Sequence, residues 1–255
     1  MAQTIKLSVV IIAFNEEHNI KRCLNSIKDI ADEIVIVDSY SSDNTKKIAG
    51  TFPVIWIEHA FKGHIEQKNY ALRQTKYDYV LSLDADECLS EQLIAEIIKI
   101  KRNCMHDGYV FNRLTNYCGK WIYHCGWYPD RKLRLWNRHK GKWGGNNPHD
   151  KVIMKKNTSI RKINQDLLHY SYNTISDHLR QVDYFTSIAA KVDYQQGRRI
   201  SLSFILFGPF IKFIRSYFLQ LGFLDGYYGF VVCAISAHAS FYKYLKIRQL
   251  QKKYA

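Results

Sequence analysis

The stretch from Tyr79 to Glu87, YVLSLDADE, joins an apolar strand pattern to two acidic residues, Asp84 and Asp86. Side chains alternate between the faces of a strand, so residues two apart point the same way, and these carboxylates can converge at its end. Carboxylates held together repel each other unless a cation or a proton lies between them. Mg²⁺ and Mn²⁺ prefer oxygen ligands and often bind through one or two carboxylates plus phosphates. The pair therefore indicates a divalent metal and a diphosphate-bearing substrate; the alternative is two solvated loop carboxylates.

Apolar segments alternate with segments of helical spacing over the first 100 residues. The apolar segments cover residues 7–14, 33–38, 54–58 and 77–84, and the helical ones 16–30, 45–49, 63–75 and 91–101. Near-continuous apolar runs rich in β-branched residues are typical of strands buried on both faces of a parallel sheet. The alternation predicts an α/β fold with an open, mostly parallel sheet flanked by helices.

Ligands of such sheets bind beyond the carboxyl ends of the strands, where Asn15, Glu16 and Asp38 also lie. A carboxylate such as Asp38 can accept hydrogen bonds from a nucleobase imide or a ribose. Lys68 would lie near this crevice and contact a base or a diphosphate, or else be a solvated helix lysine. The chain has neither G-x-G-x-x-G nor G-x-x-x-x-G-K-[ST], which argues against a dinucleotide-binding dehydrogenase and a P-loop NTPase.

The pattern changes after residue 105. Residues 108–116 read as a strand, 117–150 as a loop-rich region, and 176–197 as a helix, and the chain is apolar and aromatic from residue 200. We predict a catalytic domain over residues 1–196, with a nucleotide-binding half (1–104) and an acceptor-binding half (105–196). A basic, aromatic, helical extension follows over 197–255. Without an uninterrupted 18-residue apolar run, we expect no conventional transmembrane helix.

Charge is unevenly distributed along the chain, whose formal net charge is +14. Residues 1–100 contain 11 basic and 15 acidic residues, 101–196 contain 17 and 7, and 197–255 contain 9 and 1. The later part is therefore expected to bind a polyanion, and the candidate classes are nucleic acid, anionic lipid and phosphorylated glycan. The six cysteines show no C-x-x-C spacing, which favours reduced thiols in a cytoplasmic protein.

Four motifs occur in order: LSVVIIAFNEE (7–17), VDSYSSDNT (37–45), QKN (67–69) and LDADE (83–87). Together they resemble glycosyltransferase family 2, which has the GT-A fold. The later stretches WYPDRKLRLW (127–136), NPHD (147–150) and GFLDGYYG (222–229) resemble the branch containing lipopolysaccharide core β-1,4-glucosyltransferases. The resemblance covers most of the chain, with less specific motifs in its second half.

The resemblance implies roles for individual residues. Those expected at the nucleotide are Phe14, Asn15, Glu16, Asp38, Lys68 and Asp84. Asp86 would ligate the divalent metal, Mg²⁺ or Mn²⁺, on the diphosphate. The candidate base in this branch commonly follows a histidine as His-Glu. Here the pair is His149-Asp150, one methylene shorter, so the reach of Asp150 depends on its backbone position. The alternative is that Asp150 caps a turn or pairs with Lys151.

Inverting transfer needs a base on the acceptor hydroxyl, opposite the leaving group, and cations that offset the charge on the leaving diphosphate. Arg131 and Arg134 are candidate cations for the diphosphate or for a phosphorylated acceptor, or they belong to a basic surface loop. Trp127 could stack on a sugar face or be core, and His149 is a further candidate for this region.

The C-terminal extension interleaves aromatic and aliphatic residues with Lys212 and Arg215, which is typical of a helix lying in a membrane interface. The alternatives are a helix pair packed on the catalytic domain or a homo-oligomer interface.

With the resemblance, the sequence predicts an inverting, metal-dependent hexosyltransferase of cell-envelope glycan synthesis at the cytoplasmic membrane face. It would use a nucleotide sugar, expected to be a UDP-sugar, and a lipid-linked or lipopolysaccharide-core acceptor, with no nucleic-acid partner. Two alternatives stay open: a polyprenyl-phosphate sugar transferase, and a basic membrane- or nucleic-acid-binding module with a vestigial site.

Overall fold

The structure is a computed structural model that describes residues 3–146 and 149–253. The chain divides into two compact units. The sheet unit comprises Met1–Arg113 and Asp130–Tyr170, and the helical unit comprises Leu114–Pro129 and Ser171–Ala255. This division differs from the boundary expected at residue 196, because helix α5 (Ile175–Gln195) packs against the C-terminal helix α7 (Gly226–Lys253).

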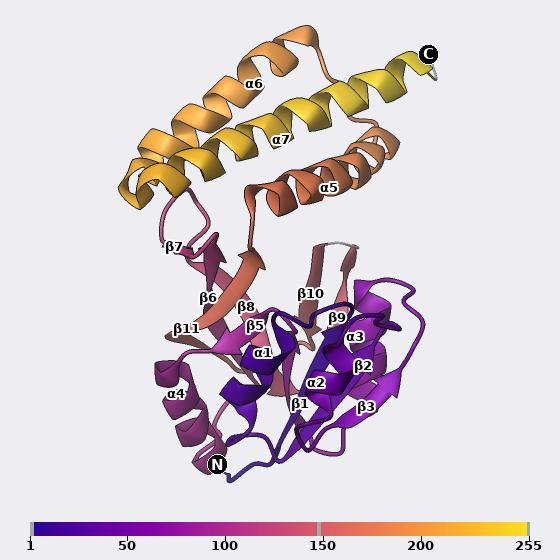
Figure 1. The fold of residues 1–255 in the computed structure, drawn as a ribbon, viewed down its shortest axis with the longest axis vertical. Helices are drawn as coiled ribbons and strands as arrows, with labels where there is room; N and C mark the ends of the chain where they lie inside the picture. The colour runs from indigo at the N-terminus through magenta and orange to yellow at the C-terminus, as the bar shows by residue number, and fades with distance from the viewer. Residues whose placement is uncertain (1–2, 147–148, 254–255) are drawn as a thin grey trace. The chain divides into compact units, whose positions relative to one another are not determined.

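One mixed sheet dominates the sheet unit (Figure 1). Its parallel part has the order β3 (Ile55–Glu58), β2 (Glu33–Asp38), β1 (Leu7–Ala13), β4 (Tyr79–Asp84). It continues through β8 (Asp130–Asn137), β6 (Gly108–Tyr117), β11 (Ile160–Tyr172) and β5 (Glu87–Leu89), with β8 antiparallel to β4 and β6, and β5 antiparallel to β11. The predicted α/β fold is confirmed.

The region expected to be loop-rich instead contains strands. Besides β8, β7 (Lys120–Ile122) pairs with β6, and β9 (Gly141–Asn146) forms an antiparallel hairpin with β10 (His149–Met154). Its many Gly, Trp, Tyr, Arg and His residues obscure the alternation of apolar and polar positions, which is the signal that marks a strand in a sequence.

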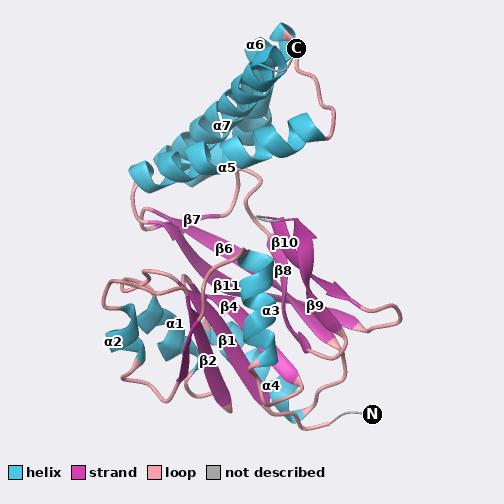
Figure 2. Ribbon diagram, turned by 90° about the vertical axis from the view of Figure 1, so that its right-hand side faces the viewer, coloured by secondary structure: helices cyan, strands magenta, loops and turns pink. Residues whose placement is uncertain are grey.

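Both faces of the central strands are buried. Val9 and Ile11 of β1 belong to the core that also holds residues of α1 (Ile20–Ile27) and α4 (Glu91–Arg102). Val10 faces the opposite core, with residues of α3 (His64–Arg73). Figure 2 shows α3 in front of the strands, with α1 and α2 (Thr45–Ala49) to the left. This two-sided burial explains why these strands read as near-continuous apolar runs.

Strand register places the acidic residues at one edge of the sheet. Ala13 at the end of β1 pairs with Asp38 at the end of β2, and Ile12 pairs with Asp84 at the end of β4. The carboxyl ends of three adjacent parallel strands therefore meet at this edge, where ligands of open α/β sheets bind.

The helical unit contains α5, α6 (Leu202–Ile214) and α7, with a π-helical turn (Arg215–Leu219) and a 3₁₀ turn (Gly222–Asp225) between α6 and α7. Helices α6 and α7 lie side by side (Figure 1). Asp225 accepts hydrogen bonds from the backbone N–H groups of Tyr123 (3.3 Å) and His124 (2.8 Å). A Cβ atom on Gly229 would lie 2.0 Å from the carbonyl oxygen of Gly222, so the GFLDGYYG motif forms a turn that requires glycine.

The segment Leu202–Leu219 is long and apolar enough to cross a membrane by length and composition, and 11% of it is buried. The sequence expectation of no such segment relied on an uninterrupted apolar run. The mean hydropathy of these 18 residues is nevertheless high enough for a membrane span, although Lys212 and Arg215 interrupt the apolar run.

His178 provides a pH test of the helical unit. It is 4% exposed, and its Nδ1 lies 3.1 Å from the Tyr117 hydroxyl. Burial lowers the pKa of His178 to about 4. The unfolded chain, with a histidine pKa of about 6.5, therefore binds a proton between pH 4 and 6.5 that the folded unit does not. The free energy of unfolding therefore has its full value above this window and is about 2 kcal/mol lower at pH 5.

We expect the urea midpoint of the helical unit to drop between pH 7 and pH 5. His178→Gln lacks the titrating group, so its midpoint should change less over the same interval. Parallel pH slopes for the two proteins would contradict this account.

Candidate functional site

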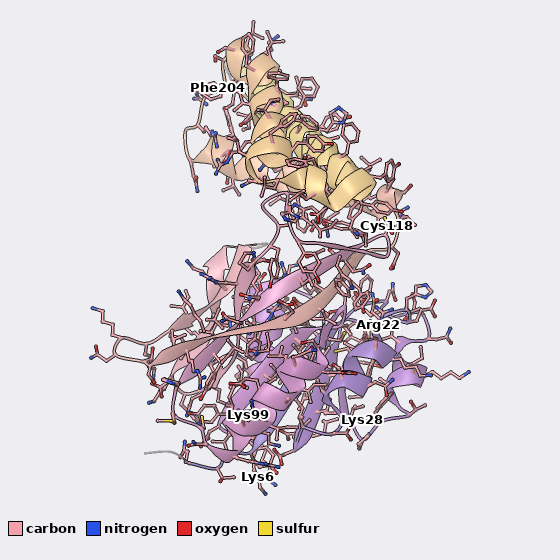
Figure 3. The ribbon with its side chains drawn as sticks, turned by 90° about the vertical axis from the view of Figure 1, so that its left-hand side faces the viewer. Lys6, Arg22, Lys28, Lys99, Cys118 and Phe204 are labelled. Atoms are coloured by element: carbon pink, nitrogen blue, oxygen red, sulfur yellow. The ribbon has the colours of Figure 1, made fainter. Side chains whose placement is uncertain are left out.

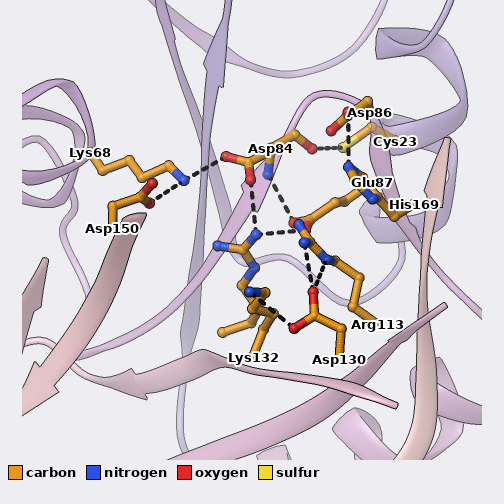
Figure 4. A network of polar contacts seen from close by, with 11 residues as sticks. Cys23, Lys68, Asp84, Asp86, Glu87, Arg113, Asp130, Lys132, Asp150 and His169 are labelled. Atoms are coloured by element: carbon orange, nitrogen blue, oxygen red, sulfur yellow. Dashed lines mark hydrogen bonds and ion pairs between the residues drawn. The ribbon is translucent and has the colours of Figure 1, made fainter. Parts of the chain in front are cut away.

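Asp84 lies between two cations at the end of β4 (Figure 4). Its Oδ1 is 2.8 Å from Lys68 Nζ, and its Oδ2 accepts from Arg134 Nη2 at 2.8 Å. Burial acts to raise the pKa of Asp84, but the charges of Lys68 and Arg134 outweigh it and hold that pKa well below its usual range. Asp84 is therefore a fixed anion.

A fully buried carboxylate supports this arrangement. Glu87 has no exposed surface, and its Oε1 lies 2.6 Å from Arg134 Nη2 and 3.4 Å from Arg113 Nη1. Its Oε2 accepts a hydrogen bond from the backbone N–H of Asp84 at 3.1 Å. Arg113 also pairs with Asp130, with 2.7 Å between Nη2 and Oδ2. Burial acts to lower the pKa of Arg134, but Glu87 and then Asp84 outweigh it and raise that pKa. Arg134 thus orients Asp84 from inside the protein, with 3% of its surface exposed.

Asp86 has a separate partner. Strand β4 ends at Asp84, so the strand alternation does not extend to Asp86. Its Oδ2 lies 3.1 Å from His169 Nε2, and the antiparallel pairing of β5 with β11 places His169 opposite Glu87. The sequence missed both His169 and Glu87. A third acid directly after the D-x-D pair was the visible signal for Glu87, whereas His169 becomes a neighbour only through strand pairing.

The surroundings of Asp86 fit a divalent cation. Burial, followed by the negative charge of Asp86, raises the pKa of Glu16 to about 7. The carboxylate of Asp86 is a ligand of the kind that suits Mg²⁺ and Mn²⁺, and the imidazole of His169 is a second donor beside it. Among the described residues, no group of three or more His, Cys, Asp or Glu side chains is arranged to hold a metal ion. Asp86 and His169 would therefore hold the ion together with ligands from phosphate or water.

The loops after β1 and β2 are tied together beside this cluster. The backbone N–H of Asn15 donates to Ser41 Oγ at 2.8 Å, and Asn15 adopts a positive φ of 54°. Asp38 is 1% exposed, and its Oδ2 accepts the backbone N–H of Ser41 at 2.7 Å. Phe14 and Tyr40 are 59% and 60% exposed. In this structure the Asp38 carboxylate accepts hydrogen bonds from Ser41 of the same loop. Its predicted contact with the nucleotide stays a prediction.

Lys68 joins Asp84 to the candidate base. It is 4% exposed, so it is not the solvated helix lysine of the alternative interpretation. Its Nζ lies 2.8 Å from both Asp84 Oδ1 and Asp150 Oδ2, and 4.4 Å from the centre of the Trp143 ring. The cation beside Asp150 is thus Lys68 of α3. Asn147 and Pro148 of the NPHD motif, and the side chain of His149, lie outside the described residues.

Two further predicted residues are not part of this network. Arg131 is exposed on β8, opposite Asn112 of β6. Trp127 belongs to the helical unit, where its ring centre lies 6.0 Å from that of Tyr117 and 5.8 Å from that of His178. Trp127 is therefore a core aromatic of that unit in this structure.

Known proteins share this sequence pattern and fold. Residues 8–161 match the profile of Glycosyl transferase family 2. An uncharacterized glycosyltransferase of Rickettsia typhi is 31% identical over 258 residues, covering 97% of this chain and 88% of the relative. The lipopolysaccharide core biosynthesis glycosyltransferase LpsC of Rhizobium meliloti is 27% identical over 263 residues, covering 98% and 94%.

A solved structure extends the similarity to the fold. The mannosyltransferase PcManGT of Pyrobaculum calidifontis, in complex with GDP-Man and Mn²⁺, matches with a TM-score of 0.55 at 14% identity, covering 96% of this chain and 87% of that one. The family profile spans more than half of the chain, and its motifs form the strand ends described above. The chain therefore belongs to glycosyltransferase family 2 and has the GT-A fold.

Proposed function

We propose that this glycosyltransferase moves a hexose, with inversion, from a nucleoside diphosphate sugar to a lipid-linked or lipopolysaccharide-core acceptor. The observation that carries the proposal is the ionic chain Asp150–Lys68–Asp84 beside the Asp86–His169 pair. It combines a candidate base, a buried cation and a metal-binding carboxylate within one unit. The similarity to LpsC supports the acceptor class, and UDP is the expected nucleotide.

Donor binding falls to Asp86, His169 and Lys68. Asp86 and His169 would hold Mg²⁺ or Mn²⁺, which when bound supplies positive charge to the diphosphate. Lys68 adds a cation with its ammonium fixed by two carboxylates. Arg134 is already balanced by Asp84 and Glu87, so we assign it to positioning Asp84 rather than to the diphosphate.

Acceptor activation falls to Asp150. Lys68 contacts its Oδ2 and so fixes the orientation of the carboxylate, while Oδ1 has no recorded contact among the described residues. Oδ1 would accept the proton of the acceptor hydroxyl as the hydroxyl oxygen attacks the anomeric carbon and the bond from that carbon to the diphosphate breaks, releasing the nucleoside diphosphate. A general base placed in this way contributes about 10²–10⁴-fold to the rate.

The first prediction concerns metal-linked nucleotide binding. Mn²⁺ with the correct nucleotide sugar, tested as UDP-, GDP- and dTDP-sugars, should raise the melting temperature by several degrees, since saturating ligand adds about 2–4 kcal/mol. Asp86→Asn should lose most of the Mn²⁺-dependent part. Asp78→Asn, the same change at a 68% exposed carboxylate, is the matched control. No metal-linked stabilisation by any of the three donors would refute the proposal.

The second prediction separates Asp150 as base from Asp150 as a structural partner of Lys68. Asp150→Asn should lower kcat about 10²–10⁴-fold while the affinity for the donor nucleotide changes little. A purely structural role would instead weaken donor binding, because Lys68 would lose one of its two carboxylates. Asp78→Asn again controls for the amide substitution.

The same variant tests the rival function. A polyprenyl-phosphate acceptor attacks through a phosphate oxygen, which needs no strong base, so Asp150→Asn would then keep much of its activity. A chain that binds polyanions in a salt-sensitive manner without turnover would correspond to the vestigial-site alternative.

We further propose that the helical unit attaches to the cytoplasmic membrane surface. Helix α6 presents large apolar side chains to its surroundings, among them Phe207 (61% exposed), Phe210 (64%) and Ile211 (63%). Figure 3 shows aromatic side chains standing out from α6 and α7, with Phe204 labelled. Lys212 and Arg215 lie on the same segment, which matches an interfacial helix beside anionic headgroups.

The third prediction tests this surface. Phe207→Ser/Phe210→Ser should lower binding to phospholipid vesicles at least tenfold, since each buried Phe contributes about 1.5–3 kcal/mol. Tyr184→Ser, at a 60% exposed aromatic of α5, is the control. A change in oligomeric state without any change in vesicle binding would show that the face is a contact between copies of the chain instead.

A further inference from the structure

A cavity of about 590 Å³ lies in the helical unit, apart from the carboxylate network. Its lining comes from the last turn of α5, the connection between α5 and α6, the first turn of α6 and the last turns of α7. Three cations contribute to it, Arg199, Arg248 and Lys252, together with Ser201 and Phe204. None of the described residues that line it is acidic. The cavity is therefore suited to an anion.

In the part of the chain that the structure describes, these cations differ from their neighbours in lacking carboxylate partners. Arg198 and Lys243 both pair with Asp193, at 3.1 and 3.3 Å. Within residues 3–146 and 149–253, the structure records no ion pair for Arg199, Arg248 or Lys252. Arg248 donates from Nη1 to a backbone carbonyl, that of Ile200, and its buried Nε has no acceptor among the described residues. Grouped cations without counter-charge repel one another, and a bound anion relieves that repulsion.

The first turn of α6 lies at the same cavity, which Ser201 and Phe204 both line. Ser201 is the N-cap residue, but its side chain makes no capping hydrogen bond and its Oγ lies 2.7 Å from Ser203 Oγ. The N–H groups of a first helical turn have no intrahelical acceptors, and the helix dipole favours negative charge there. Phosphate groups bind at such positions, here beside three side-chain cations.

Phe204 indicates that the anion belongs to an amphiphile. It lines the cavity and is 53% exposed, and it continues into the apolar face of α6, where Leu206 is 68% exposed and Phe207 61%. A ligand in the cavity would thus have its charged group on the cations and an apolar surface directly beside it. A free phosphate would leave that apolar surface uncovered.

We propose that this cavity binds the phosphate headgroup of an anionic phospholipid. The inference rests on the proposed membrane attachment of the helical unit and goes beyond it, because it assigns a defined headgroup site rather than a diffuse attraction. Arg199, Arg248 and Lys252 would bind the phosphate oxygens, with the first turn of α6 completing the site, and Phe204 would contact the acyl region.

The test uses the full chain and vesicles of phosphatidylcholine, with or without phosphatidylglycerol. Arg199→Gln/Lys252→Gln removes two cavity cations. Arg198→Gln/Lys243→Gln is the matched control, because it also removes one arginine and one lysine from the helical unit, and these two pair with Asp193 and do not line the cavity. We expect the cavity variant to lose about 30-fold of the phosphatidylglycerol-dependent affinity, at roughly fivefold per cation. The control should lose clearly less, and binding to pure phosphatidylcholine should be unchanged in both.

Equal losses in the two double variants would overturn the headgroup site in favour of diffuse electrostatics. Melting curves with inorganic phosphate, against chloride at equal ionic strength, provide the second arm. Stabilisation by phosphate equal to that by phosphatidylglycerol vesicles, and lost in the cavity variant, would mean a soluble ligand and overturn the lipid assignment. Failure of the wild-type chain to bind any vesicle would instead refute the membrane attachment itself.

Discussion

The pairing of Asp84 with two buried cations is the interaction on which the sheet unit depends. Lys68 and Arg134 are each about 4% exposed, and an isolated buried charge costs several kcal/mol. Each cation must therefore meet a carboxylate, and Arg134 needs Glu87 as well as Asp84. Removing one partner of such a pair commonly costs about 3–5 kcal/mol, because the other charge stays buried. The network thus fixes where β4, β8 and α3 must meet.

This constraint also separates the two acids of the D-x-D pair. Asp84 is held by internal cations and steadies the strand end, while Asp86 lies beside His169 with Glu16 nearby. Burial first and the charge of Asp86 second raise the pKa of Glu16, whereas the charge of Asp84 is balanced by Lys68 and Arg134. Two carboxylates that are close in sequence therefore have different surroundings, since Asp84 is held by two internal cations and Asp86 lies beside His169.

The sequence predicted the features that depend on local residue patterns, namely the buried strands and the acidic residues at their ends. Buried parallel strands read as apolar runs, and register then brought Asp38 and Asp84 to one edge of the sheet. His169 could not be predicted, because it meets Asp86 only through the antiparallel pairing of β5 with β11, two strands that are far apart in the sequence. The burial of Arg134 was missed for the same reason, and for Trp127 the sequence left sugar stacking and a core position both open. A charged or aromatic residue in a loop-like stretch shows its chemistry, but only strand pairing shows whether it faces solvent.

The sheet unit buries charged side chains, whereas the helical unit exposes large apolar ones. The segment Leu202–Leu219 meets the length and composition of a membrane span, yet Lys212 and Arg215 lie within it. Placing a lysine or arginine at the centre of a spanning helix costs about 2.5–3.5 kcal/mol each. A helix lying in the interface keeps both cations at the headgroups while its phenylalanines enter the acyl boundary. The same charges therefore argue against a spanning helix and are compatible with the proposed interfacial arrangement.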